Sequence, residues 1–268
     1  MCGIAQLGEE IFIASESSSS IAVFVFQGRQ DFTRQDDISF NELTAPPQDI
    51  AASGELQQLF VADRSGRCVW QLARSSQGHW EVKSRALSGI DPESLSVNGK
   101  QLLVVEKRRL IKFRIAANKT ELRLKLPEEF EAEHALETTD ATFIVCGQRG
   151  KVPGVKKPGI MQVSQSARVL RECDPQYFGS PCYLSPFDNI RGDLLVVDNH
   201  TQCVVVLNSL LAVVRVFLDK DHDDVVRPRR VIRSEHILVG CASSSDDSRG
   251  IVSLYWPQKS TLQELPDQ

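Results

Sequence analysis

This 268-residue sequence has no long hydrophobic run, because its most apolar stretch, Cys203 to Leu218, is interrupted by Asn208, Ser209 and Arg215. A membrane-spanning helix needs about 18 or more apolar residues in succession, so none is predicted. The N-terminus also lacks the basic segment followed by an apolar stretch that marks a secretory signal. With neither feature, we expect a cytoplasmic protein that has no membrane contact.

The sequence has little excess charge of either sign, with 31 Lys and Arg residues against 35 Asp and Glu residues. This excludes a strongly basic nucleic-acid-binding chain, although a local basic patch is compatible with it. Hydrophobic residues make up 41% and charged residues 25%, which indicates an ordinary globular protein and excludes wholesale disorder.

Metal and catalytic motifs are also missing. The seven cysteines form no CxxC pair, and the five histidines form no HxH or HxxxH pair. GxSxG and HExxH do not occur. We therefore predict no catalytic residue, no metal site and no cofactor. We expect reduced, mostly buried thiols, and a Cys173–Cys182 disulfide is the alternative in an oxidised chain.

What the sequence does contain is an internal repeat. LFVADRSGRCVWQL (59–72) aligns without a gap with LLVVDNHTQCVVVL (194–207), so that Asp63 coincides with Asp198. We call the residue at this point in each repeat the landmark. Four further segments carry equivalent positions, and the six landmarks are Ser15, Asp63, Glu106, Cys146, Asp198 and Cys241.

Each repeat is typical of four short strands, which in the second repeat are residues 49–53, 59–63, 68–73 and 79–85. A four-stranded sheet cannot bury both of its faces alone, but six such sheets arranged radially bury each face against a neighbour. We therefore predict an all-β, monomeric, six-bladed β-propeller with four antiparallel strands per blade. It would form a single domain, with blades at 1–45, 46–90, 91–131, 132–179, 180–226 and 227–268.

Two segments are less regular. Residues 128–137 are the most helix-like part of the chain, but their apolar spacing is poor and we predict mostly loop. The outermost strand of the last blade is expected at 260–265, which leaves no strand to close the ring between the first and last blades.

The stretch PPQDIAASGELQQLFVADRSGRCVWQL (46–72) resembles the NHL-type propeller repeat, in which a Pro precedes a GIAVD-like strand, a Gly turn, a YVAD-like strand and an RIQVF-like strand. Residues 92–115 and 192–207 match this pattern in part. Repeats one, four and six lack the acidic landmark. The resemblance implies the propeller fold and fixes no activity.

Asp63, Glu106 and Asp198 end the second strands of their blades. A carboxylate at this place can accept backbone N–H bonds from the following turn, so we predict a structural role. Convergence of the three carboxylates on a metal is the alternative.

The loops between the second and third strands of blades two to four are basic, and we expect them on one face together with the loops between blades. We call these cations the basic sector, which consists of Arg64, Arg67, Lys107, Arg108, Arg109, Arg149, Lys151, Lys156 and Lys157. The same face would carry the acidic residues Glu128, Glu129, Glu131 and Glu133. An acidic protein segment, RNA, or solvent alone could cover this face.

Two loops have unusual composition. Residues 147–159 form the longest loop expected within a blade, and they lack the GxxxxGK[ST] pattern of a phosphate-binding loop. Asp219, Asp221 and Asp223 have the spacing of a calcium loop, but Asp224 and Arg230 depart from the pattern. An acidic loop between blades is the simpler interpretation.

From these features we infer a non-enzymatic scaffold that recognises a protein partner through its loop face. One alternative is an RNA-binding propeller that uses the basic sector. The other is a metal-dependent hydrolase or lyase, although Asp49 and Glu137 are the only acids in or beside the expected innermost strands.

Overall fold

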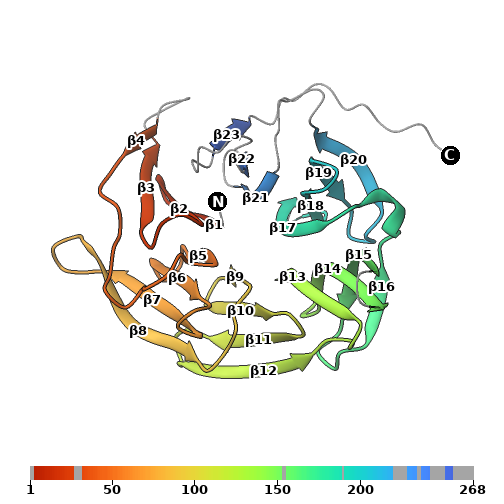
Figure 1. Ribbon diagram of the computed structural model, residues 1–268, viewed down its shortest axis with the longest axis horizontal. Helices are drawn as coiled ribbons and strands as arrows, with labels where there is room; N and C mark the ends of the chain where they lie inside the picture. The colour runs from red at the N-terminus through yellow and green to blue at the C-terminus, as the bar shows by residue number, and fades with distance from the viewer. Residues whose placement is uncertain are drawn as a thin grey trace. The chain divides into compact units, whose positions relative to one another are not determined.

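The computed structural model describes residues 3–26, 32–152, 155–188, 190–219, 228–233, 237–241 and 251–255. The chain divides into two compact units, residues 1–126 and 127–268, which are described separately. Both are built from antiparallel sheets in which strands that are consecutive in the sequence pair with one another (Figure 1).

Unit 1 contains three four-stranded sheets, which we call blades 1 to 3. Their strands are β1 (Gly3–Leu7), β2 (Glu10–Ala14), β3 (Ile21–Phe26) and β4 (Phe32–Arg34); β5 (Asp49–Ser53), β6 (Gln58–Asp63), β7 (Cys68–Arg74) and β8 (Trp80–Ser88); and β9 (Ser94–Asn98), β10 (Gln101–Glu106), β11 (Arg109–Arg114) and β12 (Lys119–Lys125). The first strands of the three blades lie side by side, with β5 between β1 and β9.

Among its described residues, unit 2 contains two four-stranded sheets, blades 4 and 5, and a three-stranded sheet, the C-terminal sheet. Their strands are β13 (Phe130–Glu137), β14 (Phe143–Val152), β15 (Val155–Val163) and β16 (Val169–Glu172); β17 (Pro181–Asp188), β18 (Asp193–Asp198), β19 (Cys203–Leu207) and β20 (Val213–Leu218); and β21 (Pro228–Arg233), β22 (Ile237–Cys241) and β23 (Ile251–Tyr255). A short 3₁₀ helix, η1 (Pro175–Tyr177), connects blades 4 and 5. Here β17 lies between β13 and β21.

The predicted all-β propeller architecture with four antiparallel strands per blade is confirmed. The structure shows five such blades, which is one fewer than the six predicted. The sixth repeat forms the three-stranded C-terminal sheet in the described part of the chain. The strand expected at 260–265 lies outside the described residues.

The second strand of each blade is buried on both faces, which explains why these strands are continuously apolar. In β6, Leu59 and Val61 belong to the core shared with blade 1, whereas Phe60 and Ala62 belong to the core shared with blade 3. The equivalent residues of β18 alternate in the same way between blade 4 and the C-terminal sheet. Alternate side chains of one strand therefore hold two neighbouring blades together.

This alternation corrects one landmark. Ile144 and Cys146 face blade 5, as Phe60 and Ala62 face blade 3, so Cys146 corresponds to Ala62. The landmark of blade 4 is therefore Gly147 rather than Cys146. The sequence alignment was displaced by one residue because apolar residues without alternation do not define which face each side chain occupies.

Residues 128–137 were predicted to be mostly loop, and this is wrong from Phe130 onward, because β13 spans Phe130–Glu137. Pairing with β14 holds this charged segment in a strand whose buried residues include Phe130, Ala132 and Ala135. Tertiary pairing thus overrides a local sequence with little strand character.

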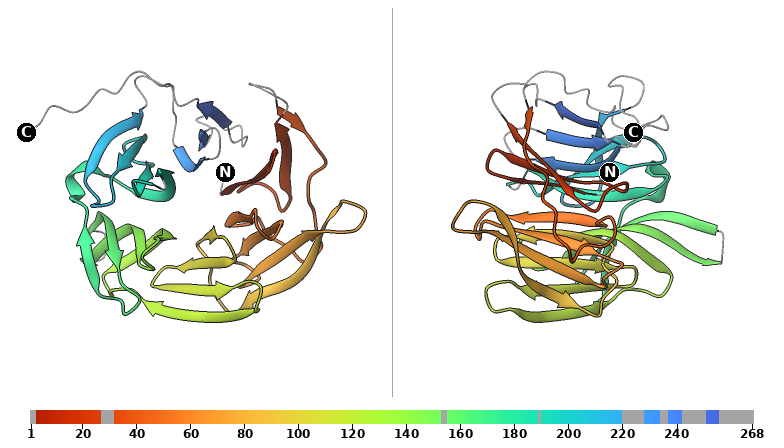
Figure 2. Two further views of the ribbon diagram at one scale, coloured as in Figure 1. Left: turned by 180° about the vertical axis from the view of Figure 1, so that it is seen from behind. Right: turned by 60° about the vertical axis from the view of Figure 1, so that its left-hand side comes forward.

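The long loop predicted at 147–159 is instead the end of a β-hairpin. Gly147 pairs with Gly159, Gln148 with Pro158 and Arg149 with Lys157, so β14 and β15 continue the ladder beyond the blade. The right-hand view of Figure 2 shows this hairpin extending past the other strands of blade 4.

Candidate functional site

Asp63 is buried at the end of β6 and joins two parts of its blade. Its Oδ1 accepts the backbone N–H of Gly66 at 2.7 Å, in the turn that follows. Its Oδ2 accepts the indole N–H of Trp70 at 3.0 Å, on β7. The carboxylate therefore fixes the loop between the second and third strands.

Asp198 is fully buried at the equivalent position of blade 5. Its oxygens accept the N–H groups of His200 and Thr201 in the following turn, both at 2.9 Å. They also accept the N–H groups of Gly179 and Ser180, at 2.7 and 3.0 Å, from the loop that enters the blade. One carboxylate thus ties together two loops of the same face.

Glu106 uses its extra methylene to make a different set of contacts. Its Oε1 accepts the backbone N–H of Asp91 at 2.9 Å, in the loop that enters blade 3. Its Oε2 forms an ion pair with Arg109 Nε at 2.7 Å. The partner in the following turn is therefore a side chain and not the backbone.

In unit 1 three arginines of the basic sector face carboxylates of the same chain. Arg64 pairs with Glu93 at 3.3 Å and Arg67 with Asp91 at 3.4 Å. Arg109 pairs with Glu106, as described above. Lys107 and Arg108 are exposed, and neither forms an ion pair with a described residue. The basic loops of blades 2 and 3 are therefore a surface of mixed charge.

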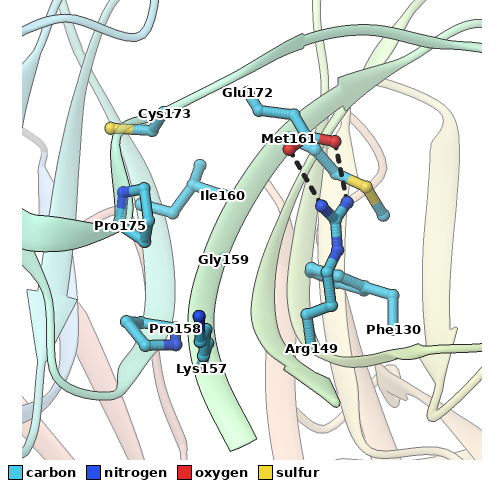
Figure 3. Close-up of a pocket in the computed structure, with 10 residues that line it drawn as sticks. All are labelled: Phe130, Arg149, Lys157, Pro158, Gly159, Ile160, Met161, Glu172, Cys173 and Pro175. Atoms are coloured by element: carbon cyan, nitrogen blue, oxygen red, sulfur yellow. Dashed lines mark hydrogen bonds and ion pairs between the residues drawn. The ribbon is translucent and has the colours of Figure 1, made fainter. Parts of the chain in front are cut away.

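In blade 4 the cations line the hairpin. Arg149 makes a two-pronged ion pair with Glu172, at 2.9 and 2.7 Å, and this contact lowers the pKa of Glu172 (Figure 3). Lys156 pairs with Glu131 at 2.7 Å, and Lys157 is exposed. Lys151 lies in β14, but its side chain is outside the described part of the structure. Beside the Arg149–Glu172 pair is a small cavity of about 110 Å³, lined mostly by Phe130, Met161, Cys173 and prolines.

A second group of polar residues lies on the first strands of the three sheets in unit 2, and sequence reasoning missed it. We call it the inner cluster: Glu133, His134, Cys182, Tyr183, Arg229 and Arg230. His134 is completely buried, and its Nδ1 accepts the backbone N–H of Leu184 from the next blade at 3.3 Å. Asp49 accepts the N–H of Leu95 in the same way in unit 1, at 2.9 Å.

The aromatic and cationic members of the inner cluster are stacked. The His134 and Tyr183 ring centroids are 3.9 Å apart, and the guanidinium of Arg230 lies 4.7 Å from the Tyr183 centroid. Arg230 Nη1 also donates to the carbonyl of Arg229 at 3.0 Å. These three side chains, from three consecutive sheets, hold one another in place.

Each first strand of unit 2 carries a β-bulge at this level. The register shifts between Ala132 and His134, between Pro181 and Tyr183, and between Pro228 and Arg230. The extra residues are Glu133, Cys182 and Arg229. In unit 1, β1, β5 and β9 pair with their second strands without a shift. A bulge changes the direction of a side chain, and bulges are common beside binding sites.

The three bulge residues act on one another electrostatically. Burial raises the pKa of the Cys182 thiol to about 11, while Arg230 and Arg229 oppose this rise and Glu133 adds to it. The thiol also donates a weak hydrogen bond to the carbonyl of Arg229 at 3.8 Å. Such a thiol is almost entirely protonated at neutral pH, so we assign it no nucleophilic role.

The structure also bears on the disulfide, the metal sites and the membrane helix considered from the sequence. Cys173 and Cys182 are both free thiols, so the alternative disulfide is not formed. No cluster of three or more His, Cys, Asp or Glu side chains suited to a metal occurs among the residues that the structure describes. Of the calcium-like segment, residues 220–227 lie outside the described residues. Within the described part of the chain, no helix has the length and apolar character needed to cross a bilayer.

The fold defines this chain as an all-β propeller with blades of four antiparallel strands. No family model matches the sequence, and no curated protein is significantly similar to it. Solved structures do match. The WD40 propeller domain of Doa1 has a TM-score of 0.63 at 9% identity, over 99% of this chain and 82% of that chain. Hydrazine synthase of Kuenenia stuttgartiensis has a TM-score of 0.63 at 14% identity, over 94% and 82%.

A third structure, the virginiamycin B lyase of Staphylococcus aureus, has a TM-score of 0.59 at 12% identity, over 96% of this chain and 84% of that chain. The names of these proteins indicate functions that differ from one another. At such low identity the similarity establishes the fold alone, so function has to be argued from the residues of this chain.

Proposed function

We propose that this protein is a non-enzymatic binding scaffold that recognises a protein partner through its loop face. The observation that carries the proposal is the pairing of five cations of the basic sector with carboxylates of the same chain. In unit 1 this concerns Arg64, Arg67 and Arg109, which face Glu93, Asp91 and Glu106. Positive and negative groups therefore alternate on a surface whose loops are fixed by buried carboxylates.

A surface of mixed charge suits a protein better than RNA. Affinity for RNA depends on how many phosphates the cations neutralise, and each carboxylate beside an arginine repels those phosphates. A protein partner can present complementary groups of both signs, which supplies specificity and orientation. Exposed ion pairs of this kind are weak, about 0–1 kcal/mol each, so a partner can rearrange them without large cost.

RNA binding is the second candidate. One observation favours it, since Lys107 and Arg108 are exposed and form no ion pair with any described residue. Single-stranded RNA that binds here would do so in a strongly salt-dependent way.

The test compares two double variants of blade 3 that remove the same charge. Lys107→Ala/Arg108→Ala changes the loop between β10 and β11, and Lys119→Ala/Arg123→Ala changes exposed residues of β12. Proteins recovered with each variant and with the wild type are quantified by mass spectrometry. We expect the loop variant alone to lose its partner. Equal recovery by all three proteins would show that this loop is not the interface.

The same variants test the RNA candidate. Binding of a single-stranded RNA oligonucleotide is measured at low and at physiological salt. Tight binding at low salt that the loop variant loses would favour RNA, and no binding at low salt would reject it.

We also propose that the chain completes a sixth, NHL-like blade and forms a single monomeric cytoplasmic domain. The pairing of Val231 with Val239 repeats that of Ile50 with Val61 in blade 2, which supports a blade rather than an unrelated sheet. An experimental structure with a fourth strand beside β23 would establish the sixth blade.

The other parts of this proposal are tested by three measurements. Light scattering tests whether the protein is a monomer. A single cooperative unfolding transition would support a single domain, and fluorescence imaging of a tagged protein tests the cytoplasmic location.

A further inference from the structure

The inner cluster offers a contact point for a partner that the basic sector does not include. Three bulges in consecutive first strands bring Glu133, Cys182 and Arg229 to the same level, beside the His134–Tyr183–Arg230 stack. All six residues belong to unit 2. The stack is a rigid support, because each ring or guanidinium contacts the next one and His134 is bonded to the backbone of blade 5.

Arg229 is the member whose hydrogen bonding is incomplete. Its Nε is shielded from solvent, and no residue in the described part of the chain accepts its hydrogen bond. A buried donor without an acceptor costs about 1–3 kcal/mol, and more for a charged group, so native structures rarely keep one without a reason. An acceptor that reaches the guanidinium fork of Arg229 from outside would remove this cost.

The charge of the inner cluster selects the kind of acceptor. Two guanidinium groups, from Arg229 and Arg230, act on Cys182 together with two carboxylates, from Glu133 and Asp198. A carboxylate carries one negative charge, and its two oxygens match the spacing of a guanidinium fork. A phosphomonoester carries about 1.5 to 2 negative charges and would be repelled more strongly by Glu133.

We propose that the inner cluster binds a carboxylate presented by an acidic side chain of the protein partner, with Arg229 and Arg230 as the donors. This inference rests on the proposed function and assigns the chemistry of one contact within it.

The test uses acetyl-Gly-Gly-Glu-Gly-Gly-amide as the probe, with the Gln peptide as its uncharged match and sodium acetate as a free carboxylate. A ligand that binds only the folded protein raises its thermal unfolding temperature as the site fills, and we call this rise protection. We therefore expect the Glu peptide to raise the unfolding temperature by about 2 °C or more at saturation. The Gln peptide should leave it unchanged.

Three variants locate the effect. Arg229→Ala removes the guanidinium, and Arg229→Lys keeps the charge but loses the fork, so both should abolish protection by the Glu peptide. Arg168→Ala removes an exposed arginine of the same unit and should leave it unchanged. Circular dichroism and thermal unfolding confirm that each variant is folded. If Arg229→Ala fails to fold, Arg229→Lys alone decides the result.

The outcomes are distinct. No protection by the Glu peptide, or equal protection by the Gln peptide, would overturn the carboxylate site. Equal protection by acetate and the Glu peptide would assign the site to a free small carboxylate and overturn the role of an acidic side chain. If a partner is recovered equally well with wild type and Arg229→Lys, the scaffold proposal stands and this inference fails. If wild type recovers no partner, the scaffold proposal fails, whatever the peptides show.

Discussion

The indole N–H of Trp70 donates a 3.0 Å hydrogen bond to Asp63, and both side chains are buried. The same carboxylate accepts the N–H of Gly66, so one charged group joins β6, β7 and the turn between them. A buried carboxylate is stable in this place because every partner is a donor that the blade itself supplies.

Asp63→Ala should lower the free energy of unfolding by about 2–4 kcal/mol, because it removes the acceptor of two buried donors. Trp70→Phe removes one donor and should cost about 1–2 kcal/mol from the lost hydrogen bond and the smaller ring. Urea unfolding of the two single variants and the double variant gives the coupling energy. Additive effects would contradict the direct interaction.

Asp198→Ala should destabilise the protein by about 3 kcal/mol or more, since backbone N–H groups in two loops lose their acceptor. Asp193→Ala, at the half-buried start of the same strand, is the matched control and should change stability by about 0.5 kcal/mol or less. Guanidinium unfolding of both variants provides the measurement. Similar losses for both would show that the buried contacts of Asp198 are not the cause.

Gly147 allows the close approach of the bulged strand β13. A Cβ atom at this position would lie 2.1 Å from the carbonyl oxygen of Glu131, which is backbone and cannot move aside. Gly147→Ala should therefore cost about 1–3 kcal/mol. Gly54→Ala is the control, because a Cβ there has no neighbour within 4 Å. A thermal unfolding temperature that falls equally in both variants would reject the steric explanation.

The Arg149–Glu172 pair should stabilise the fold in a pH-dependent way. The hydrogen bond from Arg149 lowers the pKa of Glu172, so its stabilisation is complete above the ordinary carboxyl pKa and is lost as pH falls through the lowered value. Both side chains are more than a third exposed, which limits the gain to about 1 kcal/mol.

Glu172→Gln removes this titration. We therefore expect the stability difference between wild type and variant, measured by urea unfolding, to be largest near neutral pH. It should shrink as the solution is acidified below the ordinary carboxyl range. A difference that stays constant or grows on acidification would contradict the assignment.

Much of the fold could be predicted because the apolar residues of the second strands recur at the same positions in successive repeats. Leu59, Phe60, Val61 and Ala62 are apolar since each faces one of two neighbouring blades, and the same four positions recur at 194–197. The predicted strand 49–53 matches β5, and Asp63, Glu106 and Asp198 end β6, β10 and β18 as expected.

Other features could not be predicted, because they depend on which residues of two strands or loops lie opposite each other in space. The hairpin at 147–159 looks like a loop from its glycines and lysines, and pairing of Gly147 with Gly159 makes it a ladder. The basic sector looks like a positive patch from the sequence. In space, Arg64 faces Glu93 from the loop that enters the next blade.

The sequence by itself determined the all-β class, the repeat and the positions of most strands, because two-sided burial requires apolar residues at fixed places. The tertiary structure alone decided the bulges at Glu133, Cys182 and Arg229 and the stack of His134, Tyr183 and Arg230. At a bulge, two residues of one strand lie opposite one residue of its partner. A bulge is therefore defined by the pairing of two strands and cannot be found in the sequence of one strand alone. The inner cluster joins residues about 50 positions apart, as expected when successive propeller repeats place equivalent positions side by side.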